Sequence, residues 1–152
     1  MPKRKKRLRV VFDTNVVIRH FISYRRKKQN FNRRVFELWL IRNQIQLVVS
    51  TEIVKEFLDT MKLILGIAEG LLEKWERRFF AHRADMVSPG KRFAFSRDPK
   101  DNLFLAVAAA GKADFLITND RDLLEIAEAD KRNLKFRIVT PEQLIEYWEN
   151  VS

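Results

Sequence analysis

Short apolar runs alternate with amphipathic stretches along most of the chain. An apolar run bounded by turn-forming residues predicts a buried strand, whereas apolar residues three or four positions apart predict a helix that packs by one face. The pattern predicts strands at residues 8–12, 45–49, 85–88, 115–118 and 136–139. It predicts helices at 14–22, 31–42, from Ser50 or Thr51 to about 64, 68–82, 101–110, 120–129, and from Thr140 and Pro141 onward. Because strands and helices alternate, we expect parallel pairing in a three-layer α/β sandwich.

Two of the predicted helices have distinctive apolar surfaces. The helix after Ser50 has one apolar stripe, formed by Ile53, Phe57, Met61 and Ile64. Helix 101–110 is almost wholly apolar and rich in alanine after its first turn, so we expect it to be buried and to lie close against the sheet. Gly111 follows it in the position of a C-terminal cap.

The length and composition indicate one domain that lacks thiol chemistry. The 152 residues fit a single domain, which we place at 8–152 after a basic tail at 1–7. No run approaches the roughly 18 apolar residues of a membrane span, so we expect a soluble, cytoplasmic protein that does not bind membranes. Cysteine is absent, which excludes disulfides, thiolate metal sites and a cysteine nucleophile. Because there are only two histidines, we expect any bound metal to be held by oxygen atoms.

The excess positive charge is confined to the start of the chain. Residues 1–28 hold eleven Lys or Arg and one acidic residue, whereas residues 29–152 hold nineteen of each sign. Two basic clusters produce this excess, residues 3–9 and the run Arg25, Arg26, Lys27 and Lys28. A basic patch is typical of proteins that bind a phosphate backbone, although such runs are also found as solvated tails and loops.

Several acidic side chains are predicted to gather at one edge of the sheet. Ligands of parallel α/β sheets bind beyond the carboxyl ends of the strands. Asp13 follows strand 8–12, and Asp120 lies just after strand 115–118. Asp101 lies at the start of a helix, and Glu56 borders the apolar stripe of its helix, from which it can reach the same edge.

Each acid also has a structural interpretation. Asp13 and Asp120 could be helix N-caps, and Asp122 would be favoured by the dipole of the helix that follows. Asp98 and Asp101 form an approximate capping box around a proline. The set of acids on one side of the sheet, rather than any single acid, favours a functional site.

The segments around these acids resemble the four acidic motifs of the PIN-domain family. The matching segments are residues 11–16, 53–57, 98–102 and 115–124, in the order of the family. They span nearly the whole chain, and the nearest resemblance is to single-domain bacterial and archaeal PIN proteins, often assigned as VapC-like toxins of toxin–antitoxin pairs. The resemblance implies a five-stranded parallel sheet of order 3-2-1-4-5, a divalent-metal ribonuclease activity and frequent homodimerisation.

The resemblance also implies roles for individual residues. The metal-binding and catalytic carboxylates would be Asp13, Glu56, Asp101 and Asp120, with Asp122 as an auxiliary metal ligand. Asn15, Thr118 and Asp98 would be supporting residues. Apart from the resemblance, the two basic clusters lie on either side of Asp13 in the sequence, so we expect Arg25, Arg26, Lys27 and Lys28, with the amino-terminal cluster, to attract the RNA backbone. All-oxygen coordination suits one or two Mg²⁺ or Mn²⁺ ions. The expected partners are single-stranded or structured RNA, a candidate antitoxin and a second copy of the chain.

Three functions are therefore compared. The first is a metal-dependent endoribonuclease that cleaves single-stranded RNA, as a candidate toxin. The second is a non-catalytic RNA-binding module of the same fold, which would gain nothing from a ring of carboxylates. The third is a phosphatase or phosphoacceptor domain that uses Asp13. Asn15 stands where a dehalogenase-like motif has a second Asp, and a Gly-rich phosphate loop is absent, so the third ranks well behind the first.

Overall fold

The computed structural model describes residues 6–90, 99–129 and 134–151. The strands in these ranges are β1 (Leu8–Phe12), β2 (Ile45–Val49), β3 (Ala84–Met86), β4 (Phe115–Ile117) and β5 (Arg137–Val139). The helices are α1 (Thr14–Arg25), α2 (Phe31–Leu40), α3 (Thr51–Leu65), α4 (Glu69–Ala81), α5 (Pro99–Ala110), α6 (Arg121–Ala129) and α7 (Pro141–Val151). Every one of these strands is followed by at least one helix, which confirms the predicted alternation.

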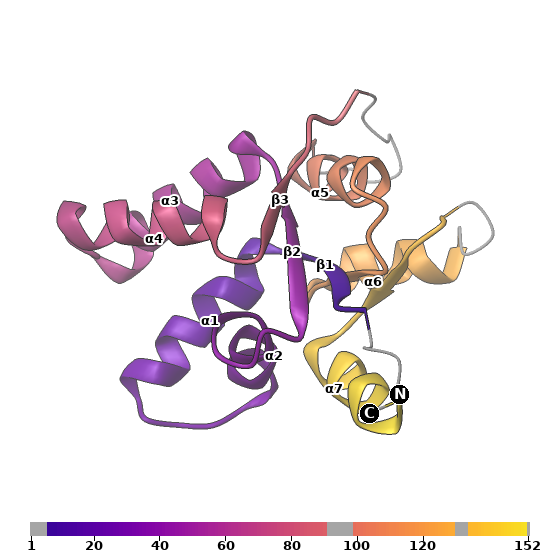
Figure 1. Ribbon diagram of the computed structural model, residues 1–152, viewed down its shortest axis with the longest axis horizontal. Coiled ribbons are helices and arrows are strands. Elements are labelled where there is room, and N and C mark those ends of the chain that lie inside the picture. The colour runs from indigo at the N-terminus through magenta and orange to yellow at the C-terminus, as the bar shows by residue number, and fades with distance from the viewer. Residues whose placement is uncertain (1–5, 91–98, 130–133, 152) are drawn as a thin grey trace.

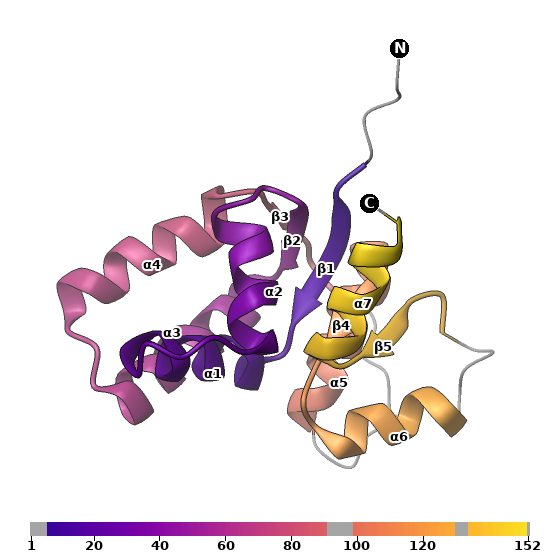
Figure 2. The same ribbon diagram turned by 90° about the horizontal axis from the view of Figure 1, so that it is seen from below.

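The strands form one parallel sheet with β1 at its centre. The order is β3-β2-β1-β4-β5, as the resemblance implied. Figure 1 shows α1 and α2 on one side of the sheet and α5 and α6 on the other, and Figure 2 gives the perpendicular view. The three-layer α/β architecture is therefore confirmed, and the carboxyl ends of the strands lie at one edge.

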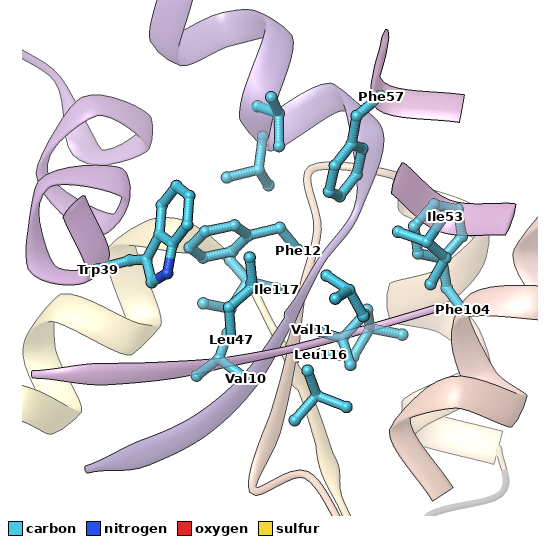
Figure 3. Packing of buried hydrophobic residues seen from close by; sticks show 14 of the residues in the cluster. Val10, Val11, Phe12, Trp39, Leu47, Ile53, Phe57, Phe104, Leu116 and Ile117 are labelled. Carbon is cyan, nitrogen blue, oxygen red and sulfur yellow. The ribbon is translucent and has the colours of Figure 1, made fainter. Parts of the chain in front are cut away.

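The core lies on both faces of the central strand. Val11 and Phe12 are fully buried, and successive side chains of a strand point to opposite faces. Phe12 packs against Trp39 of α2 at 6.2 Å between ring centroids, while Val11 pairs with Leu116 of β4 (Figure 3). Burial on both faces explains why the strand is a continuous apolar run. Within the described ranges, no helix is long and apolar enough to cross a membrane.

Several element boundaries differ from the sequence prediction, most by one or two residues, as at the end of α2, which is Leu40 instead of residue 42. α1 continues to Arg25 instead of ending near residue 22, because the Ser23 hydroxyl donates to the Arg19 carbonyl at 2.8 Å and stays within the helix. The edge strand β3 begins at Ala84 and ends at Met86, two residues before the predicted end. Its last partner is Val49, where β2 itself ends.

The structure also corrects the position predicted for Ile64 and gives a further reason for the glycine at position 111. Ile64 was expected in the buried stripe of α3, but it is 61% exposed, and Leu65 is buried in its place. The stripe advances by four residues at each step from Ile53, so the next buried position after Met61 is Leu65. α5 ends before Gly111 as predicted, but a β-carbon there would lie only 2.2 Å from Val48 Cγ1. Gly111 is therefore required by the close approach of the chain to β2.

Candidate active site

Pairing of the two central strands brings the first acid next to a polar residue of β4. Phe12 is in register with Ile117, and the Asp13 amide donates to the Ile117 carbonyl at 2.9 Å. The next residue in each chain segment, Asp13 and Thr118, therefore lies just past the end of its strand at the same edge of the sheet. This is the edge at which parallel α/β sheets bind ligands.

Asp13 is held by two side-chain donors. Its Oδ2 atom accepts a hydrogen bond from the Thr118 hydroxyl at 2.6 Å and another from the Asn15 amide at 3.0 Å. Asp13 occupies the N-cap position of α1, but its side chain makes no capping bond, so the interpretation of this acid as a helix cap does not hold. The carboxylate is 7% exposed and is directed by contacts that do not serve the helix.

The surroundings of Asp13 disfavour its charged form. Its pKa is raised from 3.8 to about 6: burial is the largest cause, the Thr118 hydrogen bond opposes it, and the charges of Asp101 and Asp120 add to it. A buried carboxylate that faces two like charges is the arrangement expected where a cation neutralises the group. The repulsion also shows that Asp101 and Asp120 both lie within electrostatic reach of Asp13.

Asp120 has a structural contact as well as a place beside Asp13. Its amide donates to the Thr118 hydroxyl oxygen at 2.9 Å, so one hydroxyl links both acids. Its Oδ1 atom accepts from the Asp122 amide at 2.9 Å and caps α6. The predicted capping role of Asp120 is confirmed, and it does not remove the side chain from the edge of the sheet.

Asn15 belongs to an amide network that the sequence did not reveal. Its side-chain oxygen accepts from the Asn119 backbone amide at 3.2 Å and from the Asn119 side chain at 3.1 Å. Asn119 also donates to Asn32 of α2 at 2.7 Å. The network joins the starts of α1 and α2 to the end of β4. Asn119 lies within the motif at residues 115–124, whereas no local sequence pattern pointed to Asn32.

One cavity of about 490 Å³ contains the four predicted carboxylates. Asp13 and Asp120 reach it from the strand ends, Asp101 from the first turn of α5, and Glu56 from α3. Asp101 is 6% exposed, and one oxygen of Glu56, Oε2, is buried. The remaining lining residues of this cavity are Thr14, Asn15, Ile18, Arg19, Ile22, Thr60, Ile64 and Phe104. The structure thus brings together four acids that lie far apart in the sequence.

The donor set suits a hard cation, although the acids are not packed into a ready-made cluster. Across residues 6–90, 99–129 and 134–151, no group of three or more His, Cys, Asp or Glu residues is spaced to hold a metal ion. Mg²⁺ commonly keeps several of its waters and uses only one or two carboxylates directly. An oxygen-lined cavity in which Asp13 is repelled by two other acids therefore fits a largely hydrated divalent ion.

Among the described residues of the two predicted basic clusters, none lines the acid cavity. Arg25 to Lys28 lie at or beyond the end of α1, which begins beside Asp13 and has 12 residues, a length of about 18 Å. Arg9 lies in β1, where its guanidinium donates to Asp85 at 2.5 Å and to the Gly111 carbonyl. Arg19 lines the acid cavity instead, one helical turn beyond Asn15.

Of the two remaining predicted acids, the structure places one relative to the cavity. Asp122 is exposed and is absent from the described residues that line it. Asp98 and residues 1–5 of the basic tail lie outside the described residues.

A second hollow shows how the acid cavity differs from other surface depressions. It has about 540 Å³ between α1, α2 and α4, and its rim carries the cations Arg25, Arg33 and Lys74. His20 lines this hollow and stacks on Phe36, with 3.8 Å between the ring centroids. Burial, followed by the charge of Arg33, lowers the His20 pKa to about 4. Glu37 is the sole acid in its described lining, so the carboxylates gather elsewhere.

Comparison with known proteins agrees with the geometry. Residues 9–122 match the family described as PIN domain. This segment includes β1 from its second residue, β4 and all four carboxylates of the cavity. A search of the curated proteins finds no significant match.

Proposed function

Because the chain belongs to the PIN-domain family, whose members are generally nucleases, we propose that it is a divalent-metal-dependent endoribonuclease that cleaves single-stranded RNA. The family typically uses divalent metals. The observation that carries the proposal is the convergence of Asp13, Glu56, Asp101 and Asp120 on one cavity at the carboxyl edge of the sheet.

The charges of the cavity support catalysis better than simple RNA binding. A phosphate would be repelled by four carboxylates, and Asp13 already has a raised pKa because of burial and its acidic neighbours. A binder of polyanions would be weakened by such a site. An enzyme that recruits a cation, in contrast, would need these carboxylates to hold the cation. The carboxylates therefore favour a nuclease over a non-catalytic RNA-binding module.

Each part of the cavity has a distinct role in the proposal. Asp13, Glu56, Asp101 and Asp120 hold one or two Mg²⁺ or Mn²⁺ ions, directly or through water. When bound, such an ion offsets the developing charge of the phosphate and makes an attacking water more acidic. The Thr118 hydroxyl and the Asn15 amide fix the Asp13 carboxylate, and contacts of this kind commonly contribute 10- to 100-fold to metal affinity, as a rough range. Arg19 supplies a positive charge for the substrate backbone.

The test is cleavage of an end-labelled single-stranded RNA of mixed sequence by purified protein with Mn²⁺, Mg²⁺ or EDTA. Asp101→Asn and Glu56→Gln keep the size of each side chain and remove one charge. We expect cleavage by the wild type with metal and loss of at least about 100-fold in each variant, since both acids line the cavity. Glu125→Gln is the matched control because Glu125 is exposed on α6 and outside the described lining, and Asp122→Asn tests separately the auxiliary ligand that the resemblance implied.

The outcomes separate the two candidate functions. Full metal-dependent cleavage by Asp101→Asn would refute the assignment of this carboxylate. RNA binding without turnover by folded, metal-loaded wild type would favour the non-catalytic module. Loss of activity in Asp122→Asn would show that Asp122 acts as the auxiliary ligand that the resemblance implied.

The biological setting is a separate proposal that rests on the resemblance. We propose that the chain is the toxin of a toxin–antitoxin pair and forms a homodimer. Growth arrest on expression, relieved by co-expression of a neighbouring small protein, would support the toxin role. Harmless overexpression of the active enzyme would count against it. Light scattering coupled to size-exclusion chromatography measures the oligomeric state directly.

A further inference from the structure

The acid cavity extends away from the carboxylates between two helices. α1 and α3 pack against each other, and Figure 2 shows them side by side. α1 contributes Asn15, Ile18, Arg19 and Ile22 to the cavity, and α3 contributes Glu56, Thr60 and Ile64. Within each helix these residues recur at intervals of three or four, so each helix presents one stripe to the space between them.

The cleft changes character along its length. At one end it is lined by Asn15 of α1 and Glu56 of α3, together with the other carboxylates. Two turns farther, about 10 Å along the helix axis, the lining residues are Ile22 and Ile64. Beyond them, the Arg25 guanidinium donates to the Leu65 carbonyl at 2.8 Å and ties the ends of the two helices together. The cleft therefore leads from a charged end to an apolar end.

The size and lining of the cleft exceed what a metal ion needs. The whole cavity, carboxylate end included, has a volume of about 490 Å³, within the range of roughly 300–1,000 Å³ seen for sites of small organic ligands. Ile64 is 61% exposed and lines this cleft, next to the buried Leu65. Thr60 offers a hydroxyl and Arg19 a positive charge in the same cleft.

We propose that the cleft between α1 and α3 is a subsite for one unpaired nucleobase of the substrate, adjacent to the phosphate bound at the carboxylates. The inference rests on the proposed function, since the phosphate fixes where the base lies. The faces of a base pack against Ile18, Ile22 and Ile64, and Arg19 contacts the backbone. A base within a duplex is paired and stacked, so it would have to be extruded to enter the cleft, at a cost of a few kcal/mol.

Contacts of this chemistry discriminate single strands from duplexes without selecting a sequence. Every base has an apolar face that can pack on Ile18, Ile22 and Ile64. Beside these isoleucines, the described lining carries two polar side chains, Arg19 and Thr60, and the other polar residues lie toward the carboxylates. The subsite thus accounts for a preference for single-stranded substrate at a site whose metal chemistry alone would not distinguish strands.

The experiment measures binding separately from cleavage. Fluorescence anisotropy with Ca²⁺ gives the affinity of the full chain for a short single-stranded RNA, its duplex, and an oligonucleotide of equal length with abasic residues in its central tract. The variants are Ile22→Ala and Ile64→Ala. Leu63→Ala is the matched control, because Leu63 is 86% exposed on the same helix and does not line the cavity.

We expect each isoleucine variant to bind the single-stranded RNA about three- to tenfold more weakly, the effect of removing part of the apolar contact with one base. Affinity for the abasic strand should not change, and Leu63→Ala should match the wild type. An equal loss on the abasic strand, or no loss at all, overturns the proposal.

Two further outcomes are decisive. A loss that Leu63→Ala shares, together with a change from dimer to monomer in light scattering, overturns the subsite and identifies this face as an interface between copies of the chain. Base-dependent binding without metal-dependent cleavage leaves the subsite intact while the nuclease proposal fails. Metal-dependent cleavage without base-dependent binding supports the nuclease proposal and overturns the subsite.

Discussion

Replacing Asp13 by asparagine should stabilise the metal-free protein while abolishing its response to metal. A shift of the Asp13 pKa from 3.8 to about 6 means that the folded state disfavours the carboxylate, chiefly by burying it. The shift corresponds to about 3 kcal/mol at neutral pH. The asparagine side chain would keep an oxygen that accepts from Thr118 without carrying a buried charge. We therefore expect Asp13→Asn to raise the free energy of unfolding by up to about 3 kcal/mol at pH 7.5 in EDTA.

The sign of the pH dependence follows from the raised pKa. Between about pH 4 and pH 6 the folded wild type binds more protons than the unfolded chain, so its stability falls as the pH rises through this window. At pH 4, close to the unfolded pKa of 3.8, the folded Asp13 is almost wholly protonated, and most of the difference between wild type and Asp13→Asn should be lost. The variant lacks this titration, so its own stability should be less dependent on pH there.

Urea denaturation followed by circular dichroism measures both quantities. It should be run at pH 4 and pH 7.5 in EDTA and repeated at pH 7.5 with Mn²⁺. Added metal should stabilise the wild type and leave Asp13→Asn nearly unchanged, because a ligand stabilises the state that binds it. A variant less stable than wild type at pH 7.5 in EDTA would refute the reasoning, since the Asp13 carboxylate would then stabilise the fold.

Three other substitutions test separate contacts. Thr118→Val removes the hydroxyl bonded to two acids and should weaken Mn²⁺ binding about 10- to 100-fold by calorimetry, whereas Thr118→Ser should retain it. Gly111→Ala should cost about 1–3 kcal/mol in urea denaturation because its β-carbon meets β2, whereas Gly70→Ala, with open space around it, should be neutral or slightly stabilising. Arg19→Gln should lower the salt dependence of RNA binding by about one phosphate contact. An equal effect of Arg26→Gln, at the far end of α1, would contradict the assignment of that contact to the cavity.

The fold could be predicted because its signals are local. The apolar run of β1 ends at the residue before Asp13, and the same holds for the run before Thr118. Parallel pairing then places Asp13 and Thr118 at one edge. Because Asp120 follows Thr118 by two residues, the two acids could be grouped before any contact was known. The order of the strands came from the resemblance, because periodicity alone does not fix which strands are neighbours.

The parts that could not be predicted depend on geometry beyond the local chain. Arg25 to Lys28 were associated with Asp13 because they are near it in sequence, but α1 carries them away from it. Arg19 was not singled out, although the same helix turns it toward the cavity. Asn32 meets Asn119 across 87 positions in the sequence, and no periodic pattern reports such a contact.

The central position of β1 determines how the site responds to thermal fluctuation. β1 has a partner strand on both sides, and the three residues before Asp13, residues 10–12, are fully buried. Amides in such a strand exchange with solvent mainly through global opening, whereas surface helices can open locally. The arrangement of Asp13 should therefore persist until the whole domain unfolds. Heating would then inactivate the protein in a single step that coincides with loss of the fold, without an earlier phase in which a folded molecule has lost its site.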